Sequence, residues 1–343
     1  MGCRIWPQPH VKNPPLPGGD FRLPFMLKIR FGALRAQSTK RKIFNLVGLP
    51  IAVVVLLEIF LRGLGFLVSL QALHGQNFWQ SAPDAAYTIL CIGDSWTAGQ
   101  PSGNYPDDLQ AALMKLHPGR RLRVVNAGMG GSNSSQALRR LTEFLPAYQP
   151  QMVIVMTGNN DHWNLSESMY WKFADQEMNA GNLWQAKAKV WLHALRVYKL
   201  YTVIAAKLTG RPTPNEFYYA PAEGQPAGSA PTTVIAPAIH HKQLEYNLLK
   251  FIELAQTNNF TLVLQTYFHF HGYQVNEIIR DVALSYHLPL VDNNLLFHEQ
   301  IPVAERPRYL VPDGHPNAAG YQFITANILA VLQAERLLPG NGR

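Results

Sequence analysis

The sequence predicts an α/β fold in which helices cover both faces of a mainly parallel, five-stranded sheet, preceded by an N-terminal transmembrane helix. Two observations carry this prediction. Short apolar runs alternate with segments of helical apolar spacing, as in a doubly wound sheet. A run of nineteen residues with one charge, 43–61, directly follows the basic cluster 40–42. A chain of 343 residues, 47% of them hydrophobic, is long enough for one such domain and extra segments.

Five apolar runs have the length and composition of buried strands. They are Tyr87–Ile92, Arg121–Val125, Met152–Met156, Phe260–Tyr267 and Leu288–Asp292. Helical apolar spacing occupies the segments 107–116, 135–145, 242–256, 275–285 and 317–332. The regular alternation of these segments predicts a single domain over 87–338.

The alternation stops at about 163–240, which we interpret as an insertion. Residues 165–208 are helix-like and rich in aromatic residues, whereas 211–238 are rich in Pro, Ala, Gly and Thr and indicate a loop. One interpretation is a cap that shapes the pocket for an acyl or alcohol group. The alternative is a packing subdomain whose tryptophans form a core.

The positive charge of the chain lies at its N-terminus. Residues 1–42 hold nine Lys or Arg and one Asp, a balance of +8 that equals the balance of the whole chain. The rest is neutral, with 21 basic and 21 acidic residues. We expect 1–42 to be a basic, largely disordered cytoplasmic leader, with Met26 as an alternative start to Met1. The neutral domain predicts no nucleic-acid partner.

The apolar run has the length of a membrane span, which takes about 20 residues. It resumes as far as Leu70, so we expect a signal anchor over 43–70 and a linker over 71–86. Glu58 and Arg62 would share a helix face near its outer end and pair there. Basic residues before the span predict a cytoplasmic N-terminus and an extracytoplasmic (periplasmic or extracellular) domain. The alternatives are a buried core helix and a cleaved signal peptide.

A nucleophile candidate follows the first predicted strand. Ser95 lies in the glycine-flanked run Gly93–Gly99, where the carboxyl end of a strand exposes side chains to ligands. A serine hydroxyl needs a base and donors for the developing oxyanion. Polar loops after the next two strands, 126–132 and 157–161, supply donors, and 311–317 supplies His315 and Asp313. In an open sheet these loops gather at one edge.

These blocks resemble, in residues and in order, those of the SGNH hydrolases, also called the GDSL esterase and lipase family. The resemblance covers roughly 87–334 and implies a flavodoxin-like α/β/α fold, Ser95 as nucleophile and His315 as general base. It also implies an oxyanion hole formed by the backbone N–H groups of Ser95 and Gly131 and the side chain of Asn160, with no metal or cofactor.

One departure concerns the acid. The family places it three residues before the histidine, whereas Asp313 stands two before His315. Asp313 is therefore the expected acid only if the backbone turns differently; otherwise a backbone carbonyl orients His315, and Asp313 caps the following helix. Among other histidines, His162, His269 and His271 are possible substrate-lining residues, and His240, His241 and His298 are expected at the surface.

The predicted activity is that of a membrane-anchored serine esterase, which hydrolyses or transfers an acyl group of a small-molecule, glycan or lipid ester through an acyl-serine. One alternative is an O-acetyltransferase or deacetylase acting on a cell-surface polysaccharide. A second is a non-catalytic glycan- or lipid-binding module with a relict site, which the short spacing before His315 favours.

Overall fold

The computed structural model describes residues 44–75, 87–177, 183–209, 237–268 and 274–338. The predictions for the leader 1–42, for linker residues 76–86, for loop residues 211–236 and for His269 and His271 lie outside these ranges.

The predicted sheet is confirmed. Its strands are β1 (Tyr87–Gly93), β2 (Leu122–Gly128), β3 (Met152–Met156), β4 (Thr261–Gln265) and β5 (Leu290–Val291). They are all parallel, in the order β2-β1-β3-β4-β5. β1 and β3 lie inside the sheet and are buried along almost their whole length. Their continuous apolar composition is typical of a parallel strand that is covered on both faces.

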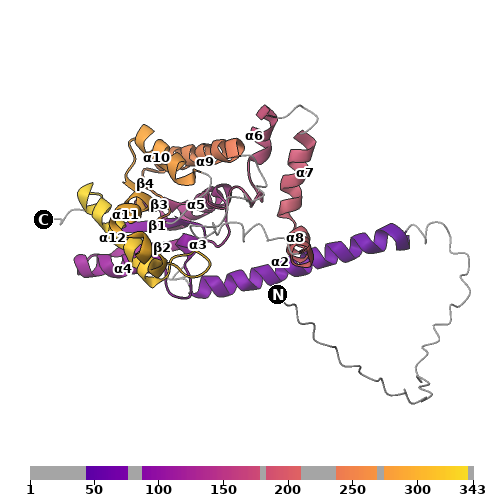
Figure 1. Ribbon diagram of the computed structural model, residues 1–343, viewed down its shortest axis with the longest axis horizontal. Helices are drawn as coiled ribbons and strands as arrows, with labels where there is room; N and C mark the ends of the chain where they lie inside the picture. The colour runs from indigo at the N-terminus through magenta and orange to yellow at the C-terminus, as the bar shows by residue number, and fades with distance from the viewer. Residues whose placement is uncertain (1–43, 76–86, 178–182, 210–236, 269–273, 339–343) are drawn as a thin grey trace, which may run out of the picture. The chain divides into compact units, whose positions relative to one another are not determined.

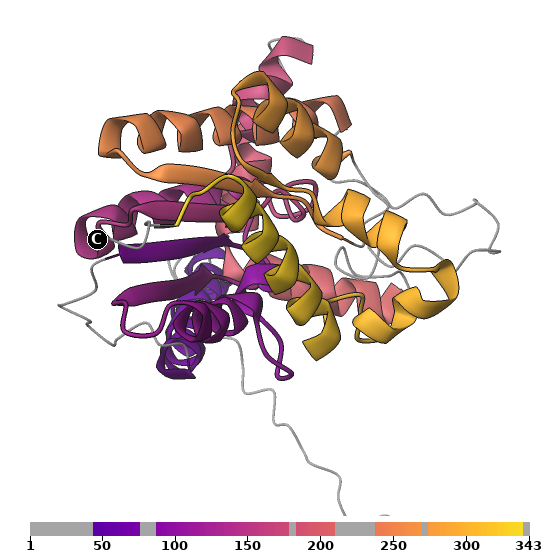
Figure 2. The same ribbon diagram turned by 90° about the vertical axis from the view of Figure 1, so that its left-hand side faces the viewer.

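Helices form the two outer layers (Figures 1 and 2). The α-helices described between residues 87 and 338 are α3 (Ser95–Ala98), α4 (Tyr105–Leu116), α5 (Ser134–Tyr148), α6 (Tyr170–Glu177), α7 (Leu183–Ala194), α8 (Arg196–Thr209), α9 (Pro237–Asn258), α10 (Val275–Ser285), α11 (Asn293–Gln300) and α12 (Ala318–Ala334). α4 and α12 contact each other and cover one face of the sheet. α9 contacts α5 and α10 on the other face.

Local sequence signals set where the main helices begin. Asn133 starts α5 with a capping box: its side chain accepts the N–H of Gln136 at 2.8 Å, and the Gln136 side chain accepts the N–H of Asn133. Asn104 caps α4, in which Pro106 lies in the first turn, where its missing N–H costs nothing. α9 starts at Pro237, five residues before the predicted 242, so residues 237–238 belong to this helix and not to the loop.

The insertion contains α6, α7, α8 and the start of α9. It has a small core of its own, separate from the main one, formed by Leu165, Tyr170, Phe173, Ala186 and Ile239. Trp184 and Trp191 are not part of it, because 80% and 63% of their surfaces are exposed. The interpretation of these two tryptophans as core is therefore wrong.

The predicted anchor is helical. α2 (Leu49–Gly75) follows a helical turn at Phe44–Gly48 and continues beyond the predicted end at 70. Within it, Phe44–Leu67 is the one stretch in the described ranges that is long and apolar enough to cross a membrane, and none of its apolar window is buried. A helix of the soluble core is usually covered, so the uncovered window favours the anchor over the core-helix alternative. Glu58 and Arg62 pair as predicted, at 2.7 Å.

We predict that Ile154→Ala destabilises the domain by about 2–5 kcal/mol. Ile154 is fully buried in β3, between Cys91 of β1 and Val263 of β4, where neighbouring strands cannot close a cavity. Urea unfolding followed by circular dichroism measures the change. The control, Met114→Ala on the exposed side of α4, should stay within about 0.5 kcal/mol of the unchanged protein. Equal losses in both variants would contradict the assigned core.

Candidate active site

The strand register brings three polar loops to one edge of the sheet. Gly93, the last residue of β1, pairs with Gly128 of β2 and with Met156 of β3. The chain therefore leaves all three strands at the same level. Because β1 lies between the other two, the loop that carries Ser95 is flanked by the loops that carry Gly131 and Asn160.

Ser95 is the first residue of the short helix α3. The preceding residue, Asp94, caps this helix, and its carboxylate accepts the N–H of Trp96 at 3.0 Å. The turn is tight: a Cβ on Gly93 would collide with the Thr97 hydroxyl and the Met156 carbonyl. Only glycine lets α3 pack this closely against the strand ends, and this packing leaves Ser95 half-buried.

The structure brings Ser95, His315 and Asp313 together. Ser95 Oγ lies 2.7 Å from His315 Nε2, and His315 Nδ1 lies 3.0 Å from Asp313 Oδ1. Both distances are those of hydrogen bonds. A hydroxyl, an imidazole and a carboxylate in this order can transfer the hydroxyl proton to the imidazole while the carboxylate stabilises the resulting charge.

A tight turn lets Asp313 reach His315 across the short spacing. The Gly314 N–H donates to the Val311 carbonyl, and the Val311 N–H donates to the His315 carbonyl, both at 2.9 Å. Gly314 has φ +81°, in the left-handed region that favours glycine. Asp313 Oδ1 also accepts the backbone N–H of His315 at 3.1 Å. The alternative in which Asp313 caps the next helix is wrong, because Asn317 caps α12.

The Asn160 amide is held by both of its ends. Its Oδ1 accepts the indole N–H of Trp163 at 2.9 Å. This bond fixes the orientation of the amide, so that the donor group Nδ2 lies at the opposite end. Its Nδ2 lies 3.0 Å from the Ser132 carbonyl and 3.4 Å from Asp94 Oδ2, beside the turn of Ser95. Trp163 cannot be singled out from the sequence, because nothing in the spacing of the loop shows that its indole reaches back to Asn160.

The Gly131 loop is tied to the same segment. Asn164 Nδ2 donates to the Gly131 carbonyl at 2.7 Å, so the loop after β2 is bonded to the loop after β3. Asp161 adds a second tie: it accepts the N–H of Ser134 at 2.6 Å and the Ser134 hydroxyl. Burial raises the pKa of Asp161 to about 6 despite these bonds. The predicted oxyanion donors thus lie on loops that are bonded to each other.

Asp94 connects the nucleophile turn to β4. Tyr267 donates its hydroxyl to Asp94 Oδ2 at 2.7 Å. Burial raises the pKa of Asp94 to about 6, although the hydrogen bonds from Tyr267 and Trp96 lower it. Tyr267 ends the apolar run predicted as the fourth strand, and its hydroxyl at that edge is the sequence signal that points to this contact.

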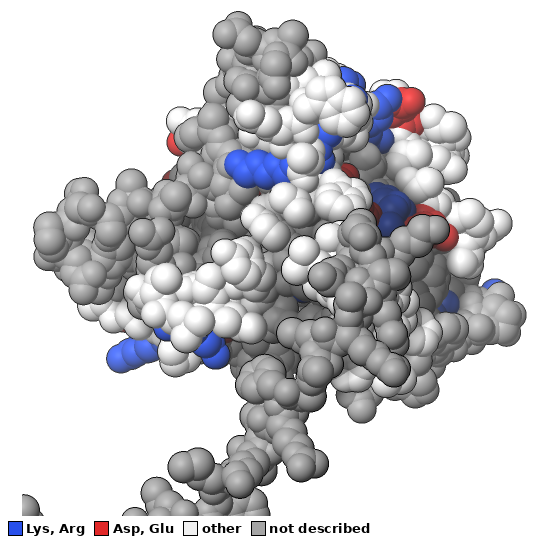
Figure 3. Space-filling model, turned by 90° about the vertical axis from the view of Figure 1, so that its right-hand side faces the viewer, with Lys and Arg blue, Asp and Glu red and all other residues white. Residues whose placement is uncertain are grey.

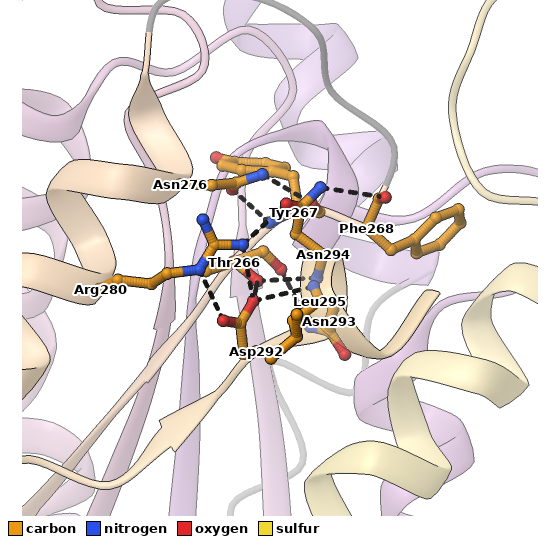
Figure 4. Close-up of polar contacts among 9 residues, drawn as sticks. All are labelled: Thr266, Tyr267, Phe268, Asn276, Arg280, Asp292, Asn293, Asn294 and Leu295. Carbon is orange, nitrogen blue, oxygen red and sulfur yellow. Dashed lines mark hydrogen bonds and ion pairs between the residues drawn. The ribbon is translucent and has the colours of Figure 1, made fainter. Parts of the chain in front are cut away.

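A polar network fixes the chain around Tyr267 (Figure 4). Asn276 accepts the Tyr267 N–H and donates to its carbonyl, both at 2.9 Å. One residue earlier, the Thr266 hydroxyl donates to Asp292 Oδ1 at 2.9 Å. Asp292 also pairs with Arg280 at 2.6 Å, and its pKa is lowered by this pair and other hydrogen bonds against the raising effect of burial. The segment that holds Asp94 is therefore itself anchored on two sides.

The remaining histidines have different positions. His162 is buried, with its ring centroid 6.2 Å from that of His240, and burial lowers its pKa well below the ordinary value. This position favours a structural role. The prediction that His240 is at the surface is wrong, because it is buried with Nε2 at 3.2 Å from the Gly158 carbonyl. In the ranges that the structure describes, no group of three or more His, Cys, Asp or Glu is placed to hold a metal ion.

The chain is similar to one protein family and to several known proteins. The model of the GDSL-like Lipase/Acylhydrolase family matches residues 91–323. Thioesterase 1/protease 1/lysophospholipase L1 of Escherichia coli (strain K12) is 39% identical over 80 residues, which are 22% of this chain and 36% of the relative. An arylesterase of Vibrio mimicus is 31% identical over 84 residues, 24% of this chain and 41% of the relative. The chain thus covers well under half the length of these relatives.

Solved structures with similar folds are more distant. A lipase/acylhydrolase from Enterococcus faecalis has a TM-score of 0.43 and 17% identity, over 73% of this chain and 96% of the other. Axe2, an acetylxylan esterase from Geobacillus stearothermophilus, has a TM-score of 0.41 and 17% identity, over 72% and 94%. At these values the two structures do not bear on the chemistry of the site.

We predict that Asp94→Asn changes how stability depends on pH. A carboxyl whose pKa rises from 3.8 to about 6 on folding stabilises the protein below pH 3.8 and loses that contribution as the pH rises through 6. The loss corresponds to about 3 kcal/mol over this window. Relative to the unchanged protein, the variant should therefore gain stability between pH 3 and pH 7, measured by urea unfolding at each pH. A difference that stays constant with pH would contradict the raised pKa.

Proposed function

Because the chain belongs to the GDSL-like lipase/acylhydrolase family, we propose that it cleaves ester bonds through an acyl intermediate on Ser95. The observation that carries this proposal is the contact of Ser95 Oγ with His315 Nε2 at 2.7 Å, with Asp313 at Nδ1. The base is within reach of the proton it must remove, and the carboxylate selects the tautomer that leaves Nε2 free to accept.

In the proposed reaction, Ser95 Oγ attacks the ester carbonyl while its proton moves to His315 Nε2. The carbonyl oxygen becomes an oxyanion, and the backbone N–H groups of Ser95 and Gly131 and the amide of Asn160 stabilise it. The C–O bond then breaks, and His315 gives its proton to the leaving alcohol. Water, deprotonated by His315, attacks the acyl-serine and releases the acid and the free enzyme.

The arrangement of the loops supports this assignment of the oxyanion donors. Gly131 and Asn160 follow the two strands next to β1, and Trp163 holds the amide with its donor end beside Asp94, the neighbour of Ser95. Donors that are held before substrate arrives need no reorganisation in the transition state. The relict-site alternative loses its argument, since the short spacing still brings Asp313 to His315.

We also propose that α2 anchors the protein in a membrane, with the N-terminus cytoplasmic and the domain outside. The uncovered apolar stretch Phe44–Leu67 and the basic cluster before it support this topology. The substrate is then a small-molecule, glycan or lipid ester that is accessible outside the cytoplasm.

We predict that Ser95→Ala reduces hydrolysis of a water-soluble p-nitrophenyl ester to the background of the assay, because no other group forms the acyl intermediate. Hydrolysis is followed by release of p-nitrophenol, and circular dichroism checks the fold. The control is Ser285→Ala, an exposed serine at the end of α10, which should retain full turnover. Turnover by Ser95→Ala at the rate of this control would refute the proposal.

We predict that Asn160→Ala lowers kcat about 10²- to 10³-fold and changes KM much less, because the lost donor acts mainly in the transition state. Steady-state kinetics with the same soluble ester measure both constants. Asn258→Ala, an exposed asparagine at the end of α9, is the control. An increase in KM at unchanged kcat would assign Asn160 to ground-state binding and contradict its place in the oxyanion hole.

A further inference from the structure

Helices α7 and α8 of the insertion carry large apolar side chains on their solvent side. We call the set Trp184, Trp191, Leu200, Tyr201, Ile204 and Leu208 the apolar face of α7–α8; all six are exposed, Leu208 by 82%. Trp184 and Trp191 lie two turns apart on α7, and Leu200, Ile204 and Leu208 lie one turn apart on α8. Each group therefore shares one side of its helix.

This pattern is the reverse of that of an ordinary surface helix. The fully buried residues of α7 and α8 are the small Ala186 and Ala206, and Val190 packs against the core of the insertion, whereas the six residues of the apolar face point outward. In α10, by contrast, Ile278, Ile279 and Val282 are buried against the domain. Large exposed apolar side chains gathered on one side of each helix mark a surface that binds a partner or a membrane.

The positive charges beside this face indicate that it binds an anionic surface such as that of a lipid bilayer. Residues 183–209 contain five Lys or Arg and no Asp or Glu; Lys187, Arg196 and Lys207 are exposed, whereas Lys189 and Lys199 are half-buried. Figure 3, which views the side on which α7 lies in Figure 1, shows blue side chains among a mainly uncharged described surface, with fewer red ones. Aliphatic residues and tryptophans on one side, with Lys and Arg at its borders, are typical of helices that lie in the headgroup region of a bilayer.

The start of α8 is bonded to the proposed anchor. Within residues 53–343, the Glu58 carboxylate accepts the N–H groups of Arg196 and Val197 at 3.1 and 2.9 Å. Arg62 donates to the Ala194 carbonyl, the last residue of α7, at 3.0 Å. Of the nineteen-residue run 43–61, Glu58 lies near the outer end and Arg62 just beyond it. The junction of α7 and α8 is thus bonded near the outer end of this run.

We propose that the apolar face of α7–α8 docks on the outer surface of the membrane that α2 spans, with its side chains at the boundary of headgroups and acyl chains and its Lys and Arg on anionic headgroups. The inference rests on the proposed anchor and not on the proposed ester chemistry. It gives the insertion a second contact with the bilayer besides the span itself.

Quenching of tryptophan fluorescence by brominated lipid tests this docking. The full chain is placed in nanodiscs of equimolar phosphatidylcholine and phosphatidylglycerol, with and without bromine on the phosphatidylcholine acyl chains. The double variant Trp184→Phe/Trp191→Phe should lose most of the quenchable emission. The matched control, Trp171→Phe, removes a partly buried tryptophan of α6 and should keep it. Equal quenching in the double variant and the unchanged chain would overturn the proposal.

A second pair of variants keeps the tryptophans as reporters. Ile204→Glu/Leu208→Glu should reduce quenching of Trp184 and Trp191, whereas Leu284→Glu, at an exposed leucine of α10, should not. If brominated lipid does not quench these tryptophans, something other than the bilayer covers the face. A chain that is dimeric by light scattering would then assign the face to a second copy, and a monomeric chain would assign it to residues 210–236. Either result overturns docking. Hydrolysis of a soluble ester, measured on the same samples, shows separately whether the proposed chemistry fails.

Discussion

The buried carboxylate of Asp94 is the interaction on which the rest of the site depends. It accepts the N–H of Trp96 in its own turn and the hydroxyl of Tyr267, two residues after the end of β4. It also lies beside the Asn160 amide, which follows β3. A carboxylate without these donors would be costly to bury, and even with them its pKa is raised. Burial of Asp94 is therefore electrostatically unfavourable, but its hydrogen bonds fix the turn of Ser95 relative to two other loops.

Strand register then turns this local arrangement into a site. Gly93 pairs with both Gly128 and Met156, so one level of the sheet sets where three loops start. His315 comes from a distant part of the chain and is placed by the turn at Val311–His315 and by α12. Each of these parts is held by backbone bonds or buried side chains of the chain itself. Preorganisation of this kind is what acyl transfer requires of its donors.

The sequence predicts the sheet well, because buried parallel strands and amphipathic helices leave periodic patterns. It predicts the ends of the elements less well: α9 begins earlier than expected, and β5 is only two residues long. Contacts between segments that are distant in the chain leave no periodic pattern in the sequence. For this reason the sequence does not predict the bonds of Trp163 to Asn160 and of Tyr267 to Asp94, and its prediction of a surface position for His240 is wrong. The sequence does not decide whether Asp313 reaches His315, because this depends on the φ angle of one glycine.

Acylation of Ser95 is the step on which the proposed function depends. Mixing the protein with a short-chain p-nitrophenyl ester, quenching in acid within the first turnover and mapping the digested peptides by mass spectrometry tests it directly. We predict one acyl group, on the peptide and at the residue of Ser95, formed in a burst that His315→Ala strongly slows. An acyl group on another residue, or a burst of the same size in Ser95→Ala, would contradict the account.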